Sequence, residues 1–231
     1  MSESPGGRPS GKLLRRFVEL IEAELVLAGF VRRGPVFRYI DPSGNGIVLD
    51  IQRTTALDGE VAFFVNVGLL LAPYVRFFLG DRDPRLDTTS AHGIWRHRLM
   101  AEVTSANLPD HTFSLTTDKD AEHAAAIVLD WLANNLPVLK GQLDVDAMLA
   151  AAEEHRRRGE LASAEQLATG RWQPGRWPDG NWNTALLRAY AHAEHGDLDA
   201  VSAAIGDLPA GASRLTGEIL ALAHRRAEGS A

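Results

Sequence analysis

The chain is 231 residues long, contains no cysteine and carries a formal net charge of −6. The lack of cysteine excludes disulfides, thiol nucleophiles and thiolate metal sites, and the acidic balance argues against a nucleic-acid-binding protein, which usually presents a basic stripe. The longest apolar run, over residues 61–73, is too short to span a bilayer and is interrupted by Asn66 and Gly68. We therefore expect a cytoplasmic protein that does not contact a membrane.

The first regular element expected from the N-terminus is a helix. Residues 1–11 are rich in Gly, Pro and Ser and lack an apolar signal core, so we expect a disordered tail there. Residues 13–28 place apolar side chains three or four positions apart, which is the spacing of one helical face. Gly29 supplies the left-handed position that ends a helix. The sequence therefore predicts a helix over residues 13–28.

The apolar period then changes from helical to alternating, which indicates strands. Residues 36–40 and 47–52 flank a dense turn signal, and residues 61–70 are apolar on both faces, as in a central strand. Residues 94–103 and 112–116 are predicted as a fourth and a fifth strand. We expect the charged, proline-containing segment 73–93 to be a loop.

Helical patterns dominate the rest of the chain. A second helix is expected to begin at Thr117 or Asp118 and to end at Pro137. Beyond a domain boundary at Gly141 we expect a helix from Asp144 to Gly159, another that resumes at Leu161, and three more over residues 184–195, 198–205 and 213–227. The fold class predicted is α+β: an antiparallel sheet of four to five strands flanked by two helices over residues 12–140, then a small all-α helical-hairpin domain over residues 141–231.

The strand alternation also predicts a candidate site. If the face that carries Ile47, Leu49 and Phe63 packs beneath the two helices, the opposite face is polar. Its side chains are Arg38, Asp50, Gln52 and Asn66, joined by Arg98 or Arg96 depending on the register. Such a stripe is suited to a small anion or to the polar surface of a protein partner. The alternative is a face that is merely solvated, or covered by the C-terminal helices with its polar groups paired.

Histidines are the next candidates for chemistry. His92, His97 and His111 surround the expected fourth strand and could converge as a base or as metal ligands. His192 and His195 lie three apart on an expected helix without an identifiable third ligand, so we expect surface histidines and no metal site.

Common enzyme signatures are missing from the sequence. We find no nucleophile elbow, no phosphate-binding loop and no dinucleotide fingerprint, so no cofactor is expected. Trp172, Trp177 and Trp182 lie in and beside a Pro/Gly loop, where they either fill a seam between helices or stack on a ligand.

A series of short motifs runs through the first 140 residues. It comprises Gly29 and Phe30, Phe37, residues 52–54, residues 64–68, Trp95 and residues 97–99. In this order and spacing the series resembles the bacterial family known as domain of unknown function 4304, over about residues 12–140. The resemblance implies an α+β fold with strands between two helices, and no established activity. The chain departs from the family pattern near His111, where a tryptophan is expected, so the register of the last strand is left open.

The helical tail lies outside this resemblance. A Gly-acid-Leu pattern at residues 159–161 and 196–198 is weakly similar to tetratricopeptide hairpins, but two units are too few for a solenoid. The leading functional prediction is a non-enzymatic binding or protein-interaction module that uses the polar face of its sheet. The alternative is an enzyme that acts on a small polar or phosphorylated substrate through Asp50, Arg98 and a nearby histidine.

Overall fold

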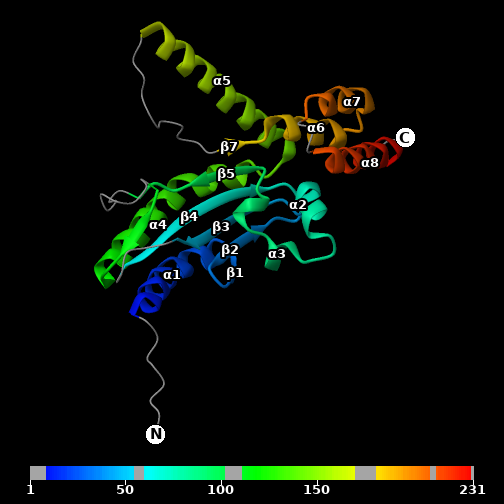
Figure 1. The fold of residues 1–231 in the computed structure, drawn as a ribbon. Coiled ribbons are helices and arrows are strands. Elements are labelled where there is room, and N and C mark those ends of the chain that lie inside the picture. Colours follow the sequence, from blue (N-terminus) through cyan, green and yellow to red (C-terminus); the bar gives the residue numbers. More distant parts are fainter. Residues whose placement is uncertain (1–8, 55–59, 102–110, 170–180, 209–211, 230–231) are drawn as a thin grey trace.

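The computed structural model describes residues 9–54, 60–101, 111–169, 181–208 and 212–229. Its elements, in chain order, are α1 (Pro9–Leu27), β1 (Val31–Arg33), β2 (Val36–Ile40), β3 (Gly46–Arg53), β4 (Val61–Leu70), α2 (Ala72–Leu79), α3 (Pro84–Asp87), the 3-10 turn η1 (Ser90–His92), β5 (Trp95–Arg98), β6 (Phe113–Leu115), α4 (Asp118–Gly141), α5 (Val145–Thr169), β7 (Asn181–Trp182), α6 (Thr184–Glu194), α7 (Leu198–Gly206) and α8 (Ser213–Gly229). The protein is thus α+β with a helical C-terminal part, as expected (Figure 1).

The strands form one sheet in the order β1-β2-β3-β4-β5-β7, and β6 pairs with the other end of β4. All of these pairs are antiparallel. The sheet exceeds the four to five strands expected, because β1 and β7 contain only three and two residues and are too short to show an alternating period. β7 pairs Trp182 with Trp95, so the C-terminal part adds a strand to the sheet.

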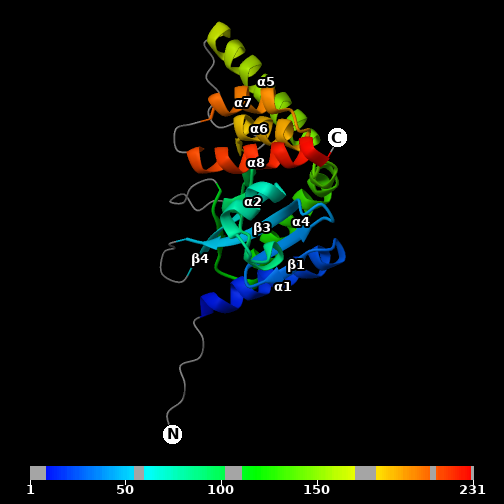
Figure 2. The same ribbon diagram turned by 90° about the vertical axis from the view of Figure 1, so that its right-hand side faces the viewer.

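Helices α1 and α4 cover one face of the sheet, as the sequence predicts (Figures 1 and 2). The centre of this layer is aromatic: the ring of Phe63 on β4 lies 4.8 Å from that of Phe17 on α1 and 5.4 Å from that of Phe113 on β6. All three side chains are buried, and the apolar cluster around them continues into α5, α6 and α8. The sheet and the helical part therefore share one core.

The opposite face of the sheet is covered by residues 72–92, which we call the cover segment. The prediction of a loop at 73–93 is wrong, because α2, α3 and η1 lie there. Both prolines that suggested a loop stand in the first turn of a helix, where the missing N–H has no intrahelical partner to lose. Val75 and Leu79 of α2 bury the sheet residues Val48 and Leu70 in a second small core.

Glycine lets the cover segment approach the sheet closely. A Cβ on Gly93 would lie 2.6 Å from the carbonyl oxygen of Trp95 and 3.2 Å from the Cα of Gly68, closer than packed atoms come. Any larger residue at Gly93 would therefore push η1 away from β4.

Three helix boundaries differ from the prediction. α1 begins at Pro9, so residues 9–11 of the expected tail are helical, and the rest of that tail lies outside the described residues. α4 passes through Pro137 and ends at Gly141, because the residues beyond the proline still bury Leu139 against the core. α5 continues through Gly159, where a break was expected. A glycine inside a helix costs only about 1 kcal/mol relative to alanine, so it need not end the helix. Ion pairs along α5 favour the continuous helix: Arg156 with Glu160, and Arg157 and Arg158 with Glu154.

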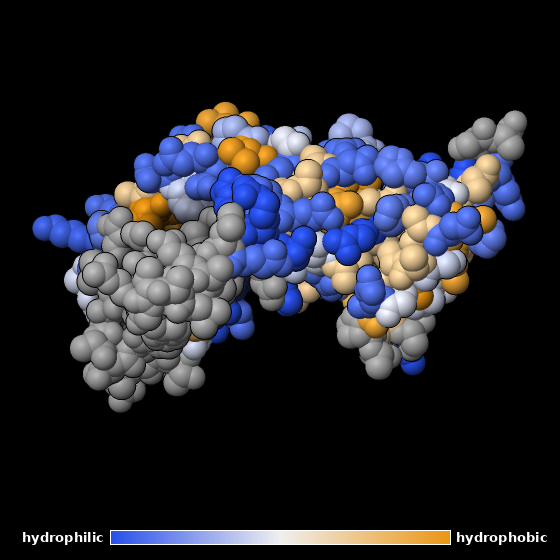
Figure 3. Space-filling view, turned by 90° about the horizontal axis from the view of Figure 1, so that it is seen from above, coloured by the Kyte–Doolittle hydropathy of each residue, from blue (hydrophilic) through white to orange (hydrophobic). Residues whose placement is uncertain are grey.

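The C-terminal helices form a further layer beyond α2. Asn183 caps α6 and Asp197 caps α7, each by accepting a backbone N–H three residues on. α6 contacts both α7 and α8 (Figures 1 and 2). The C-terminal end of α8 lies against the turn between α6 and α7, at Gly196. Seen from above, the surface not covered by grey atoms is mostly hydrophilic, with apolar residues scattered across it (Figure 3). Within the described ranges, no helix is both long enough and apolar enough to cross a membrane.

Candidate functional site

Four of the five predicted site residues form one connected group, which we call the polar stripe: Asp50, Gln52, Asn66 and Arg98. The strand register places Asp50 opposite Asn66, and Asn66 opposite Arg98. The Asn66 side-chain amide donates to Asp50 Oδ1 (3.1 Å) and to Gln52 Oε1 (3.3 Å). The Nε of Arg98 in turn donates to Asn66 Oδ1 (2.9 Å). The alternating period therefore located a continuous polar chain that crosses three strands.

The inner end of the polar stripe is buried under the cover segment. Asp50 is 9% exposed and Asn66 is 7% exposed. The second carboxylate oxygen of Asp50 accepts the backbone N–H of Ser90 (2.7 Å), at the start of η1. This inner end is therefore neither solvated nor covered by the C-terminal helices, the two arrangements weighed from the sequence, because the cover segment lies over it. Asp50 thus holds the cover segment on the sheet, and Asn66 is bonded to Asp50 from the neighbouring strand.

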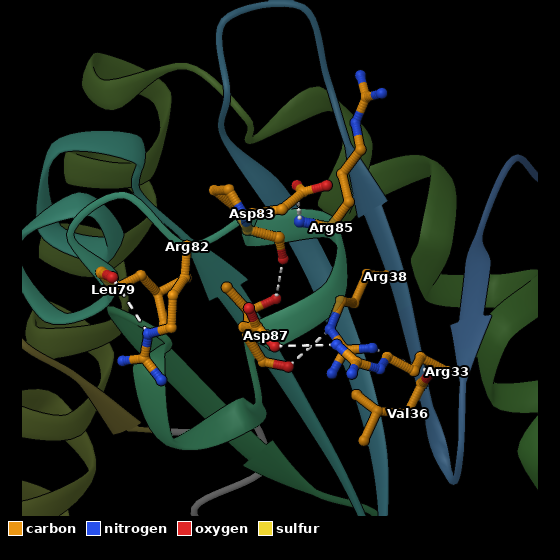
Figure 4. Close-up of polar contacts among 10 residues, drawn as sticks. Arg33, Val36, Arg38, Leu79, Arg82, Asp83, Arg85 and Asp87 are labelled. Carbon is orange, nitrogen blue, oxygen red and sulfur yellow. Dashed lines mark hydrogen bonds and ion pairs between the residues drawn. The ribbon is translucent and has the colours of Figure 1, made fainter.

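Arg38 does not join the polar stripe. It lies opposite Val48, is 4% exposed and donates from Nε to the carbonyl oxygen of Thr88 (2.7 Å). Beside it, Arg33 of β1 pairs with Asp87 at the end of α3 (3.0 Å; Figure 4). Burial lowers the pKa of Arg38, and the nearby charge of Arg33 lowers it further. Arg38 thus anchors α3 and is closed to a ligand.

The outer end of the polar stripe is open to solvent. Gln52 and Arg98 are both exposed, and the guanidinium carbon of Arg98 lies 3.9 Å from the centroid of the Phe64 ring. Asn66 and Phe64 therefore fix the guanidinium from two sides. Neither terminal nitrogen of Arg98 has a hydrogen-bond or ion-pair partner within the ranges that the structure describes. These nitrogens are available to an acidic group.

The three candidate histidines occupy different places. His97 faces the helix side of β5, opposite Arg98, because adjacent residues of a strand point to opposite faces; its ring stacks between Trp95 (5.8 Å) and Trp131 (5.4 Å). His92 lies in the cover segment, where its Nδ1 accepts the backbone N–H of Thr89 (3.0 Å). His111 precedes β6, and its Nδ1 is buried without a hydrogen-bond partner among the described residues. The described contacts do not assemble a histidine with Asp50 and Arg98.

Of the remaining histidine candidates, His192 lies on α6 and His195 is the residue that caps its C-terminal end. The Nε2 atom of His195 is 3.0 Å from both carboxylate oxygens of Asp146 on α5, and this hydrogen bond raises the pKa of the imidazole. Among the residues with described positions, no three potential metal ligands come together.

The contact of His92 predicts a pH-dependent cover segment. Burial, helped by the charge of Arg82, lowers the pKa of His92 below its usual 6.5, so the folded ring is neutral and can accept from Thr89. The unfolded chain then binds more protons than the folded one, and the stabilisation is present above about pH 6.5 and lost as the pH falls through the folded pKa. We expect acidification below about pH 6.5 to speed amide exchange across residues 88–93, after correction for intrinsic rates. His92→Asn keeps an acceptor that does not titrate and should remove this response; an equal response in both proteins would contradict the assignment.

An aromatic cleft of about 340 Å³ lies on the other side of β5, bounded by α4 and α5. Trp131, His97, Trp95 and Trp182 line it in series, and the ring centroids of Trp95 and Trp182 are 5.9 Å apart. The rings are packed on one another, and the carboxylate on its rim, Glu154, is already paired with two arginines. We therefore assign Trp182 to the seam between the sheet and the helical part; Trp172 and Trp177 lie outside the described residues.

Comparison of the chain with protein-family models, with curated proteins and with solved structures finds no match. By its fold and its polar stripe, this is an α+β protein whose sheet carries a chain of polar side chains that is buried at one end and ends in an exposed arginine at the other. The likeness to the family of domain of unknown function 4304 stays an expectation that rests on the sequence motifs.

Proposed function

We propose that this protein is a non-enzymatic binding protein that recognises an acidic group on a protein partner with the outer end of its polar stripe. The observation that carries the proposal is the state of Arg98, whose guanidinium is held by Asn66 and stacked on Phe64 while its terminal nitrogens have no partner among the described residues. A guanidinium fixed in this way loses little conformational entropy on binding, and its planar fork matches a carboxylate.

The surroundings of Arg98 support a protein partner. Gln52 is exposed beside it and offers an amide, and the half-buried Phe64 and the exposed Met100 offer apolar contact. Arginine is one of the residue types enriched at the hot spots of protein interfaces. The overall charge of −6 disfavours a nucleic acid as the partner. We also propose a cytoplasmic location, which fractionation of the host cells tests.

The test has two stages. Affinity capture from the native host with the intact protein identifies the partner, and calorimetry with the purified partner measures the effect of each variant. We expect Arg98→Ala to weaken binding by about 10- to 100-fold, since a hydrogen bond to a charged group is worth about 1.5–3 kcal/mol. Arg98→Lys keeps the charge but loses the stacked fork, so its effect should be intermediate.

Arg96→Ala is the matched control, because Arg96 is exposed on the same strand and the same face but lies one row away from the polar stripe. It should bind like the wild type. Arg98→Ala should lower the melting temperature by no more than a few degrees, because the side chain is exposed and its loss leaves a single buried atom, Asn66 Oδ1, without its donor. Undiminished binding by Arg98→Ala, or loss of binding only through unfolding, argues against the proposal. A tightly retained metabolite in place of a protein would favour the enzyme alternative.

A further inference from the structure

A second cleft, of about 530 Å³, lies between the cover segment and the C-terminal helices. α2 forms one wall, and α6 and α8 form the other. Phe77 and Leu222 are among its lining residues and give it an apolar part. The volume suits a small organic molecule. None of the residues of the polar stripe lines this cleft.

Tyr190 of α6 lines this cleft and is 1% exposed, yet its hydroxyl has no hydrogen-bond partner among the described residues. Burial raises the pKa of this hydroxyl, so it stays protonated and is a donor at neutral pH. A buried hydroxyl without a partner is unfavourable in the free protein, and nearly all buried polar groups in native structures are paired. An acceptor that reaches Tyr190 from the cleft would satisfy it.

The charges around the cleft indicate which acceptor fits. Arg76 on α2 and Arg225 on α8 contribute to opposite walls, and neither has an ion-pair partner within the described part of the chain. Glu194 is already paired with Arg226 (2.6 Å), which leaves Glu218 as the opposing charge on this rim. Arginine forks on two sides and a tyrosine donor between them suit an oxyanion.

We propose that this cleft binds a small organic oxyanion, that is a carboxylate or a phosphate monoester with an apolar body. Its oxyanion accepts from Arg76, Arg225 and the Tyr190 hydroxyl, and its apolar body packs on Phe77 and Leu222. Because the walls belong to α2 and to α6 and α8, the bound anion joins the cover segment to the C-terminal helices.

The experiment measures the binding of four probes to the full chain by calorimetry and by thermal shift: phenyl phosphate, benzoate, inorganic phosphate and the uncharged benzyl alcohol. We expect the two aromatic anions to bind and to raise the melting temperature, and whichever of them binds more tightly identifies the head group. Tyr190→Phe and Arg76→Ala should each weaken that binding by about tenfold or more.

The stability of the free protein separates a binding role of Tyr190 from a structural one. Tyr190→Phe removes an unpaired hydroxyl, so its melting temperature without ligand should equal or exceed that of the wild type while its ligand-induced shift is lost. Arg214→Gln is the matched control on α8, because Arg214 lies outside the lining of the cleft, and it should bind like the wild type.

Three results would overturn the proposal. The first is that neither aromatic anion binds, or that benzyl alcohol binds as well as they do. The second is that Tyr190→Phe and Arg76→Ala bind the anions with undiminished affinity. The third is a lowered melting temperature of ligand-free Tyr190→Phe, since this would show that the hydroxyl already has a partner.

Discussion

Replacing Phe63 by alanine is expected to lower the free energy of unfolding by about 3–5 kcal/mol, the usual cost of deleting a buried aromatic ring. Phe63 is fully buried, and its ring contacts Phe17 of α1 and Phe113 of β6, so the cavity would open between α1 and the sheet. Urea denaturation followed by circular dichroism measures the change. Such a loss is a large part of the 5–15 kcal/mol that stabilises an ordinary domain.

The control is Phe78→Ala on α2. Phe78 is 43% exposed and touches mainly the aromatic rings of its own helix, Tyr74 and Phe77. Its loss should cost less than about 1 kcal/mol, as for most surface positions. Equal losses at Phe63 and Phe78 would show that the aromatic centre of the core is elsewhere.

Replacing Asp50 by alanine is expected to lower the free energy of unfolding by about 2–4 kcal/mol. The substitution leaves two donors, the Ser90 N–H and the Asn66 amide, without their acceptor, and a buried unsatisfied donor costs about 1–3 kcal/mol. Asp50→Asn keeps one acceptor oxygen and should lose roughly half as much. Urea denaturation curves measure the free energy of unfolding of each variant.

Hydrogen exchange locates the effect of the Asp50 variants. Ser90, which bonds to Asp50, is the first residue of η1. We therefore expect the Asp50→Ala variant to lose amide protection across residues 83–93 before it loses protection in the strands of the sheet. Arg38→Met should loosen the same residues from the other side, through Thr88. If Asp50→Ala keeps both its stability and this protection, the inner end of the polar stripe does not hold the cover segment and its burial needs another reason.

The strand face of the polar stripe could be predicted because alternation fixes which side chains share a side, whatever the register. The burial of the polar stripe could not be predicted, because it depends on the helices of the cover segment. Pro73 and Pro84 are equally typical of turns and of the first turn of a helix. The same alternation contains a signal that was missed: His97 and Arg98 are adjacent on a strand and cannot face the same site. The enzyme alternative combined Asp50 and Arg98 with a nearby histidine, and alternation along the strand removes His97 from the possible choices.

Tyr190 was missed for a different reason. Within α6 it sits among buried residues at helical spacing and reads as an ordinary core aromatic. Whether its hydroxyl finds a partner depends on how α2, α6 and α8 meet, which no local pattern records. The pairing of β7 with β5 is likewise a contact between distant segments, and a strand of two residues carries no period.

That short pairing has a consequence for solubility. A sheet with an open, flat border invites another copy to add its own strand there, which is a route to aggregation. Here β7 occupies part of the border at β5, and the opposite border ends in β1, three residues long with two arginines. Because β7 leads into the C-terminal helices, these helices help to protect the border of the sheet from pairing with a strand of a second copy.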